Sequence, residues 1–133
     1  MKIRFLAPTV MACLILLVST GCMNGPKPDL GARDATVSSV MQALHAADKD
    51  QLIKLSQPGP QYADGYAQMM ISDWGGVKDS GYSTSYSSEA APEFVAVRVS
   101  TQDSSGRPAD VEFALRWNDR TWLLDIGSDL NRT

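Results

Sequence analysis

The most restrictive feature of this sequence is a change in the spacing of its apolar residues at Gly75 and Gly76. Before this point, apolar residues recur every three or four positions, which is typical of amphipathic helices. After it, apolar and polar residues alternate, which is typical of strands with one buried face. Helices that precede all the strands predict an α+β fold, with N-terminal helices packed on one face of a curved antiparallel sheet of about four strands.

The helical part is predicted to begin at Asp34, whose side chain can accept from the free N–H groups of a first turn. The polar residues 48–50 indicate that this helix is kinked or split, and Pro58 ends it. A second helix is predicted over residues 61–72, and Gly75 and Gly76, which follow it, are expected to stop it. The first helix is marked by apolar residues at helical spacing: Val37, Val40, Met41, Leu44, Ala47, Leu52 and Leu55.

The alternating part predicts a weak, edge-like strand over residues 77–88 and three further strands. A tight connection at residues 118–121 places Trp117 opposite Trp122, Leu115 opposite Leu124 and Phe113 opposite Ile126. A looser turn at 104–108 sets Val99 opposite Val111, Val97 opposite Phe113 and Val95 opposite Leu115. The face that the helices are expected to cover carries Val97, Phe113, Leu115, Trp117, Trp122 and Leu124.

The opposite face of the sheet is expected to carry Arg98 opposite Glu112. Its most distinctive feature is a predicted row across three strands, formed by Phe94, Arg116 and Leu123. Aromatic and arginine residues are enriched at interaction centres, so we interpret this row as an interaction surface, either for an envelope protein partner or for self-association. Asp125 alternates with two apolar neighbours and is expected to point out to the same face.

Residues 1–21 have the layout of a secretory signal peptide. Lys2 and Arg4 form a basic start, residues 10–18 are apolar, and small residues follow. A membrane-spanning helix needs about 20 mostly apolar residues, and this run is about half as long. The sequence therefore predicts export.

Residues 18–22 (VSTGC) resemble a bacterial lipobox, although Ser19 stands where that motif prefers a large aliphatic residue. The resemblance implies cleavage between Gly21 and Cys22 and acylation of Cys22, which would attach the protein to the membrane. Met23, rather than Asp, follows the cysteine, which implies outer-membrane attachment facing the periplasm in a bacterium with two membranes. We expect residues 22–33 to be a lipidated, flexible tether and residues 34–133 to form the domain.

The charge and composition disfavour several classes of function. The formal charge falls from −3 to −5 when Lys2 and Arg4 leave with the signal, so no basic surface for nucleic acid is expected. The mature chain keeps one cysteine, which excludes an intrachain disulfide. We expect no metal site, because no Cys/His cluster remains, and no cofactor, because no nucleotide- or phosphate-binding motif is present.

The segments ATVSSVMQALHAADKDQLIKLS and VEFALRWNDRTWLLDIG resemble small bacterial lipoproteins of the nuclear-transport-factor-2-like superfamily. This resemblance implies a cone of helices on a strongly bent sheet. It also implies that any catalytic groups would lie inside the cone, so His45, Tyr62 and Tyr66 are candidate cavity residues. A simpler interpretation is that His45 is an ordinary helix histidine and that Tyr62 and Tyr66 are core tyrosines.

We therefore expect a non-enzymatic, lipid-anchored module that binds a small ligand or a protein. The alternative is a small cofactor-free enzyme, an isomerase or hydrolase, that acts in the cone. An enzyme would need a carboxylate, histidine or tyrosine directed into a cavity, and the sequence assigns no catalytic residue.

Overall fold

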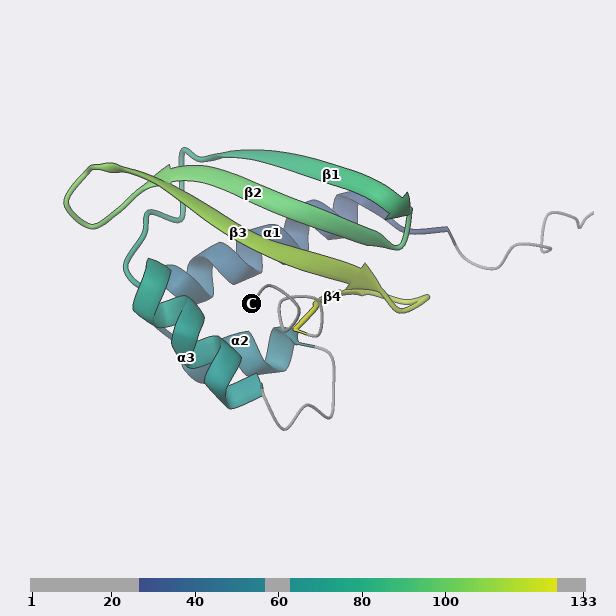
Figure 1. The fold of residues 1–133 in the computed structure, drawn as a ribbon, viewed down its shortest axis with the longest axis horizontal. Helices are drawn as coiled ribbons and strands as arrows, with labels where there is room; N and C mark the ends of the chain where they lie inside the picture. The colour runs from purple at the N-terminus through teal and green to yellow at the C-terminus, as the bar shows by residue number, and fades with distance from the viewer. Residues whose placement is uncertain (1–26, 57–62, 127–133) are drawn as a thin grey trace, which may run out of the picture.

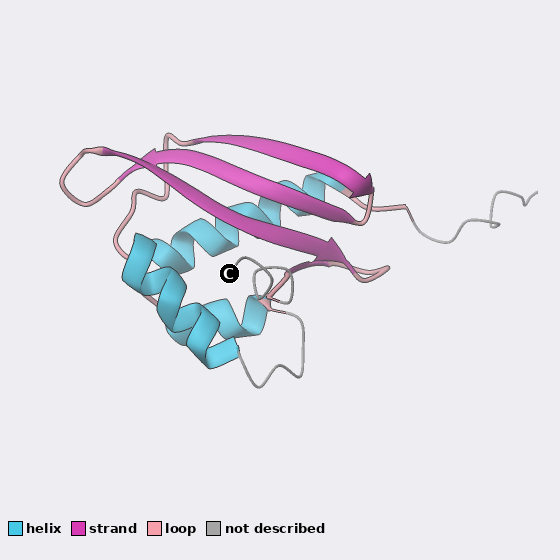
Figure 2. Ribbon diagram, viewed as in Figure 1, coloured by secondary structure: helices cyan, strands magenta, loops and turns pink. Residues whose placement is uncertain are grey.

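The computed structural model describes residues 27–56 and 63–126. Within these ranges, helices α1 (Leu30–His45), α2 (Lys49–Leu55) and α3 (Ala63–Trp74) precede strands β1 (Ser83–Ala91), β2 (Phe94–Gln102), β3 (Pro108–Trp117) and β4 (Trp122–Leu124) (Figure 1). The helices lie on one side of a curved antiparallel sheet (Figure 2), which confirms the predicted fold class. The predicted signal peptide, Cys22 and Tyr62 lie outside the described residues.

Helix α1 begins earlier than the sequence pattern predicts. Its N-cap is Asp29, whose Oδ1 accepts from the Ala32 N–H at 3.1 Å. The prediction of Asp34 as the N-cap is therefore wrong, and residues 30–33, which we expected in the tether, are helical. Both aspartates can cap a helix; the earlier one is held in place by Trp122, which donates to its carbonyl.

The predicted break near residues 48–50 is confirmed. Ala47 adopts a positive φ of 51°, and the Asp48 side chain accepts from the Gln51 N–H to begin α2. The predicted second helix is α3. It ends before Gly76, which has a φ of 86° and donates its N–H to the Leu44 carbonyl. That left-handed conformation favours glycine and ends the helix.

The sheet has the strand order β1-β2-β3-β4, and the predicted register of its two central strands is confirmed. The Leu115–Leu124 and Trp117–Trp122 pairs are also confirmed. The Phe113–Ile126 pair is not formed as part of the ladder, because β4 ends at Leu124. One further bond, from the Asp125 N–H to the Ala114 carbonyl at 2.8 Å, follows the predicted register beyond that end.

Strand β1 covers residues 83–91 rather than the predicted 77–88. Gly81 has a φ of 68°, so the chain cannot be extended through it, and the strand starts beyond it. Val77 is buried in the core, and Lys78 donates its N–H to the Gln102 carbonyl. The residues near 77 are therefore not part of a strand. They form an irregular segment that is anchored in the core by Val77 and bonded to the last residue of β2 by Lys78.

The inner face of the sheet, defined by the apolar residues under the helices, is the face predicted from the sequence. Phe113 and Trp117 are 4% and 8% exposed, and Leu115 and Leu124 are fully buried. Each such side chain contributes roughly 1.5–3 kcal/mol by leaving water. They pack with core residues of the three helices, including Val40, Met41, Leu44, Leu52, Tyr66 and Met70. In residues 27–56 and 63–126, no helix combines the length and apolar character needed to cross a bilayer.

Candidate functional site: a groove on the outer face of the sheet

The outer face of the sheet carries three rows of side chains that run across the strands. The Phe94 row contains Phe94, Arg116 and Leu123, which are successive cross-strand partners as predicted. The Arg98 row contains Ser85, Arg98 and Glu112. Between them lies the alanine row, which contains Ser87, Ala96 and Ala114.

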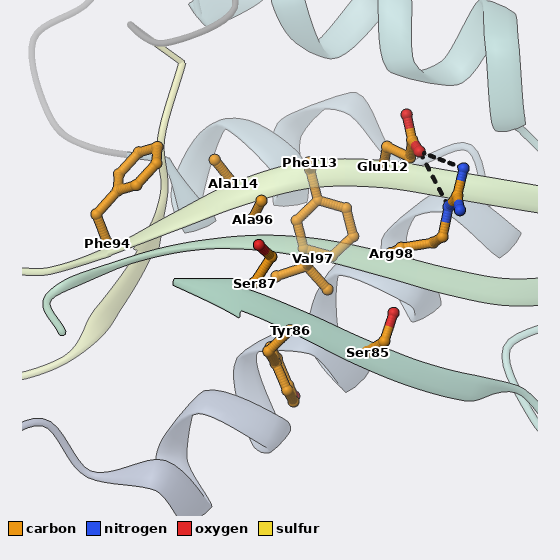
Figure 3. A pocket seen from close by; sticks show the side chains of 10 residues that line it. All are labelled: Ser85, Tyr86, Ser87, Phe94, Ala96, Val97, Arg98, Glu112, Phe113 and Ala114. Atoms are coloured by element: carbon orange, nitrogen blue, oxygen red, sulfur yellow. Dashed lines mark hydrogen bonds and ion pairs between the residues drawn. The ribbon is translucent and has the colours of Figure 1, made fainter. Parts of the chain in front are cut away.

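The alanine row is the floor of a groove, because its short side chains lie between two rows of longer ones. This groove has a volume of about 500 Å³, and it is lined by the alanine row, the Arg98 row and, from the Phe94 row, Phe94. Phe94 stands at one end, and Arg98 with Glu112 stands at the other (Figure 3). The two walls are four residues apart along β2, or roughly 13 Å. A groove of this width accepts an extended chain or a single layer of side chains.

The Phe94 row, whose phenylalanine stands at this end of the groove, combines an aromatic ring with a cation. The Arg116 guanidinium carbon lies 5.3 Å from the centroid of the Phe94 ring, within range of a cation–π contact. Phe94 and Leu123 are partly exposed rather than buried beneath a helix. This part of the outer face is therefore accessible in the described structure.

Arg116 is held in place by a buried carboxylate. Its Nε and Nη2 atoms donate to Asp125 Oδ2 at 3.2 and 3.0 Å. The Asp125 side chain is 3% exposed, whereas that of Arg116 is 47% exposed. We expected Asp125 to face solvent on the outer side of the sheet. It meets Arg116 on that side, but its carboxylate is buried rather than exposed to solvent.

The opposite wall holds a solvent-exposed ion pair. Arg98 Nη2 lies 3.0 Å from Glu112 Oε1, and Arg98 Nε donates to the same oxygen at 3.0 Å. The two side chains are 58% and 47% exposed. An exposed pair of this kind contributes about 0–1 kcal/mol to stability, so its principal effect is to place both charges at the edge of the groove.

The candidate cavity residues do not meet in one site. His45 is exposed at the end of α1, and its Nδ1 lies 2.9 Å from the Val77 carbonyl oxygen. In the tautomer protonated on Nδ1, it donates to that carbonyl and ties α1 to the segment before β1. Tyr66 is 8% exposed and belongs to the core between α3 and the sheet. Among residues 27–56 and 63–126, no carboxylate is bonded to His45, so these parts of the chain form no His–Asp pair.

A cluster at the start of α1 was not foreseen from the sequence. The Tyr86 hydroxyl donates to Asp34 Oδ1, and the Arg33 guanidinium carbon lies 3.6 Å from the Tyr86 ring centroid. Partial burial and the bond to Asp34 raise the pKa of Tyr86 to about 12, although the Arg33 charge acts in the opposite direction. The sequence pattern missed this cluster because it placed residue 33 in the tether and residue 34 at the cap.

In residues 27–56 and 63–126, no group of three or more histidine, cysteine, aspartate or glutamate side chains is placed to hold a metal ion. Comparison with protein-family models, curated proteins and solved structures finds no match for this chain.

Proposed function

We propose that this chain is a lipid-anchored protein of the bacterial cell envelope that binds another protein through the outer face of its sheet. The anchoring part rests on the sequence: a basic start, an apolar run, and small residues that lead to Cys22. Stable attachment needs more than one acyl chain, and an acylated N-terminal cysteine of the lipobox type carries two or three.

The binding part rests on one observation, the Arg116 guanidinium held between the Phe94 ring and the buried Asp125 carboxylate. Arginine and aromatic side chains dominate the energy of protein interfaces. A guanidinium that is already fixed loses less side-chain entropy when a partner arrives. The adjoining groove, with its small floor and a charge of each sign on its far wall, can receive a strand or loop of a second protein.

The inner face supports this choice of surface. The inward side chains from Val95 to Val99 and from Val111 to Trp117 are packed in the core with those of the helices and are at most 8% exposed. The enzyme alternative would need reactive groups that converge in the cone. His45, however, is bonded to a backbone carbonyl, and Asp125 is bonded to Arg116 from the outer side.

Anchoring is tested by feeding a labelled fatty acid to cells that express the full-length chain. The wild type should incorporate the label, and Cys22→Ser should incorporate none and leave the membrane fraction. A Cys22→Ser variant that stays membrane-bound at the wild-type level would show that the apolar run is a retained anchor.

Binding is tested by placing a photoreactive phenylalanine analogue at position 94 of the anchored, full-length protein. The matched control position is Gln68, which is exposed on α3 away from the sheet. We expect a discrete adduct from position 94 and none from position 68. Ala96→Gln, which fills the groove floor, should abolish that adduct. An adduct mass of twice the chain identifies self-association, and any other mass identifies a different envelope protein. Equal labelling at both positions contradicts the proposal.

A further inference from the structure

The start of α1 fixes which end of the domain is nearest to its anchor. Asp29 is tied to the domain by two contacts: its carbonyl accepts from Trp122 Nε1 at 2.7 Å, and its side chain caps α1. The β1–β2 turn lies at the same end, because Trp117 donates its N–H to the Glu93 carbonyl at 2.7 Å. We call this end, with Asp29, Leu30, Glu93 and residues 118–121, the tether pole.

The opposite end is the β2–β3 turn at residues 103–107, closed by the Asp103 N–H to Arg107 carbonyl bond. Helix α1 and strand β2 both run between the two ends (Figure 1). Strand β2 spans eight residue steps, so the far turn lies roughly 26 Å from the tether pole. Helix α1, with 16 residues, spans a similar distance of about 24 Å.

Only seven residue steps separate Cys22 from Asp29. Fully extended, they reach at most about 25 Å. An acyl group on Cys22 therefore confines the tether pole to within that distance of the lipid, whereas the far turn can lie farther away by up to the length of the domain. Leu30, at the tether pole, is 58% exposed, so its side chain is free to contact a lipid surface there.

From this geometry we infer that the domain stands with its tether pole against the bilayer surface and its β2–β3 turn directed away from it. The inference rests on the proposed acylation of Cys22. The Phe94 row belongs to the tether pole, since Phe94 begins β2 and Arg116 is next to the last residue of β3. This orientation presents the Phe94 row close to the membrane, within reach of a partner held in the same membrane.

The chain has two cysteines, Cys13 and Cys22. Under the proposed processing, Cys13 leaves with the signal peptide and Cys22 is acylated, so no free thiol of the native sequence remains. A single new thiol can therefore be labelled in the acylated full-length product. Arg120→Cys at the tether pole and Ser105→Cys at the far turn are matched, since both residues are polar and exposed in turns. Each fluorophore-labelled protein is bound to phosphatidylcholine vesicles that contain a lipid with a nitroxide quencher on its headgroup.

The label at position 120 should be quenched roughly twofold or more beyond the label at position 105, because about 26 Å of strand separates the two ends. Equal quenching, or stronger quenching at position 105, overturns the orientation. Fatty-acid labelling and vesicle flotation of the same samples separate the two hypotheses. A protein that carries no acyl group disproves the anchor, whereas an acylated, vesicle-bound protein with equal quenching disproves the orientation alone.

Discussion

The Trp122 indole nitrogen donates a 2.7 Å hydrogen bond to the carbonyl oxygen of Asp29, which precedes it by 93 residues. This bond joins the last strand to the residue that caps the first helix. The neighbouring Trp117 ring is tilted against Trp122 with centroids 5.6 Å apart. The Trp117 Nε1 atom is buried and has no hydrogen-bond partner among the described residues. Both tryptophan side chains are therefore packed in the core, but among the described residues only the Trp122 indole nitrogen has a hydrogen-bond partner.

Trp122→Phe should destabilise the protein more than Trp117→Phe. The first change removes a hydrogen bond that contributes about 1 kcal/mol, and the second removes a buried donor whose desolvation costs about 1–3 kcal/mol. Both changes remove similar apolar area, so the difference in unfolding free energy should exceed about 1 kcal/mol. Urea denaturation of the two variants measures it, and a larger loss for Trp117→Phe would contradict the assignment.

Truncation of the inner-face core should unfold the domain or come close to it. Phe113→Ala and Leu124→Ala should each cost about 2–5 kcal/mol, because both side chains are almost fully buried and leave a cavity. Domains of this kind are stable by only about 5–15 kcal/mol. Met69→Ala is the control, since Met69 is 45% exposed. Thermal denaturation should show a large fall for the first two variants and almost none for the third.

The two ion pairs of the outer face should differ in strength. Arg116→Ala leaves the Asp125 carboxylate buried without its guanidinium, and we expect a loss of about 1–3 kcal/mol after allowance for the half-exposed arginine. Arg98→Ala should cost less than about 1 kcal/mol, because the Arg98–Glu112 pair is exposed. Denaturation at low and high salt provides the comparison. Equal losses would show that Asp125 does not depend on Arg116.

Tyr86 should make the folded protein less stable at high pH. Its pKa is raised to about 12 in the folded state, against 10.0 for an unperturbed tyrosine. The folded state therefore holds the proton more tightly, so this contribution to stability is complete below pH 10 and is lost between about pH 10 and 12. Phenolate absorbance should show a late-titrating component near pH 12 that Tyr86→Phe removes. Asp34→Asn should shift that titration to lower pH.

Much of the fold could be predicted because the spacing of apolar residues along the chain shows which face of each helix or strand is buried. The alternation of Val95, Val97 and Val99 against Val111, Phe113 and Leu115 excludes a slip of one residue. With the turn at residues 104–108 it predicts the register that is present. The start of α1 could not be predicted in the same way. Asp29 and Asp34 carry the same capping signal, and only tertiary contacts distinguish them: Trp122 donates to the Asp29 carbonyl, and Tyr86 donates to the Asp34 carboxylate.

The sequence by itself determined the order of helices and strands, the inner face, and the Phe94 row, because each follows from a repeat of two or of three to four residues. Only the tertiary structure decided the environment of Asp125, the partner of His45, and the Tyr86 cluster at the start of α1. Those contacts join residues that are up to 53 positions apart in the chain. Periodicity assigns a side chain to a face, but packing of other elements decides whether that position meets solvent or a partner. Arg116 therefore covers a carboxylate that alternation alone would place in water.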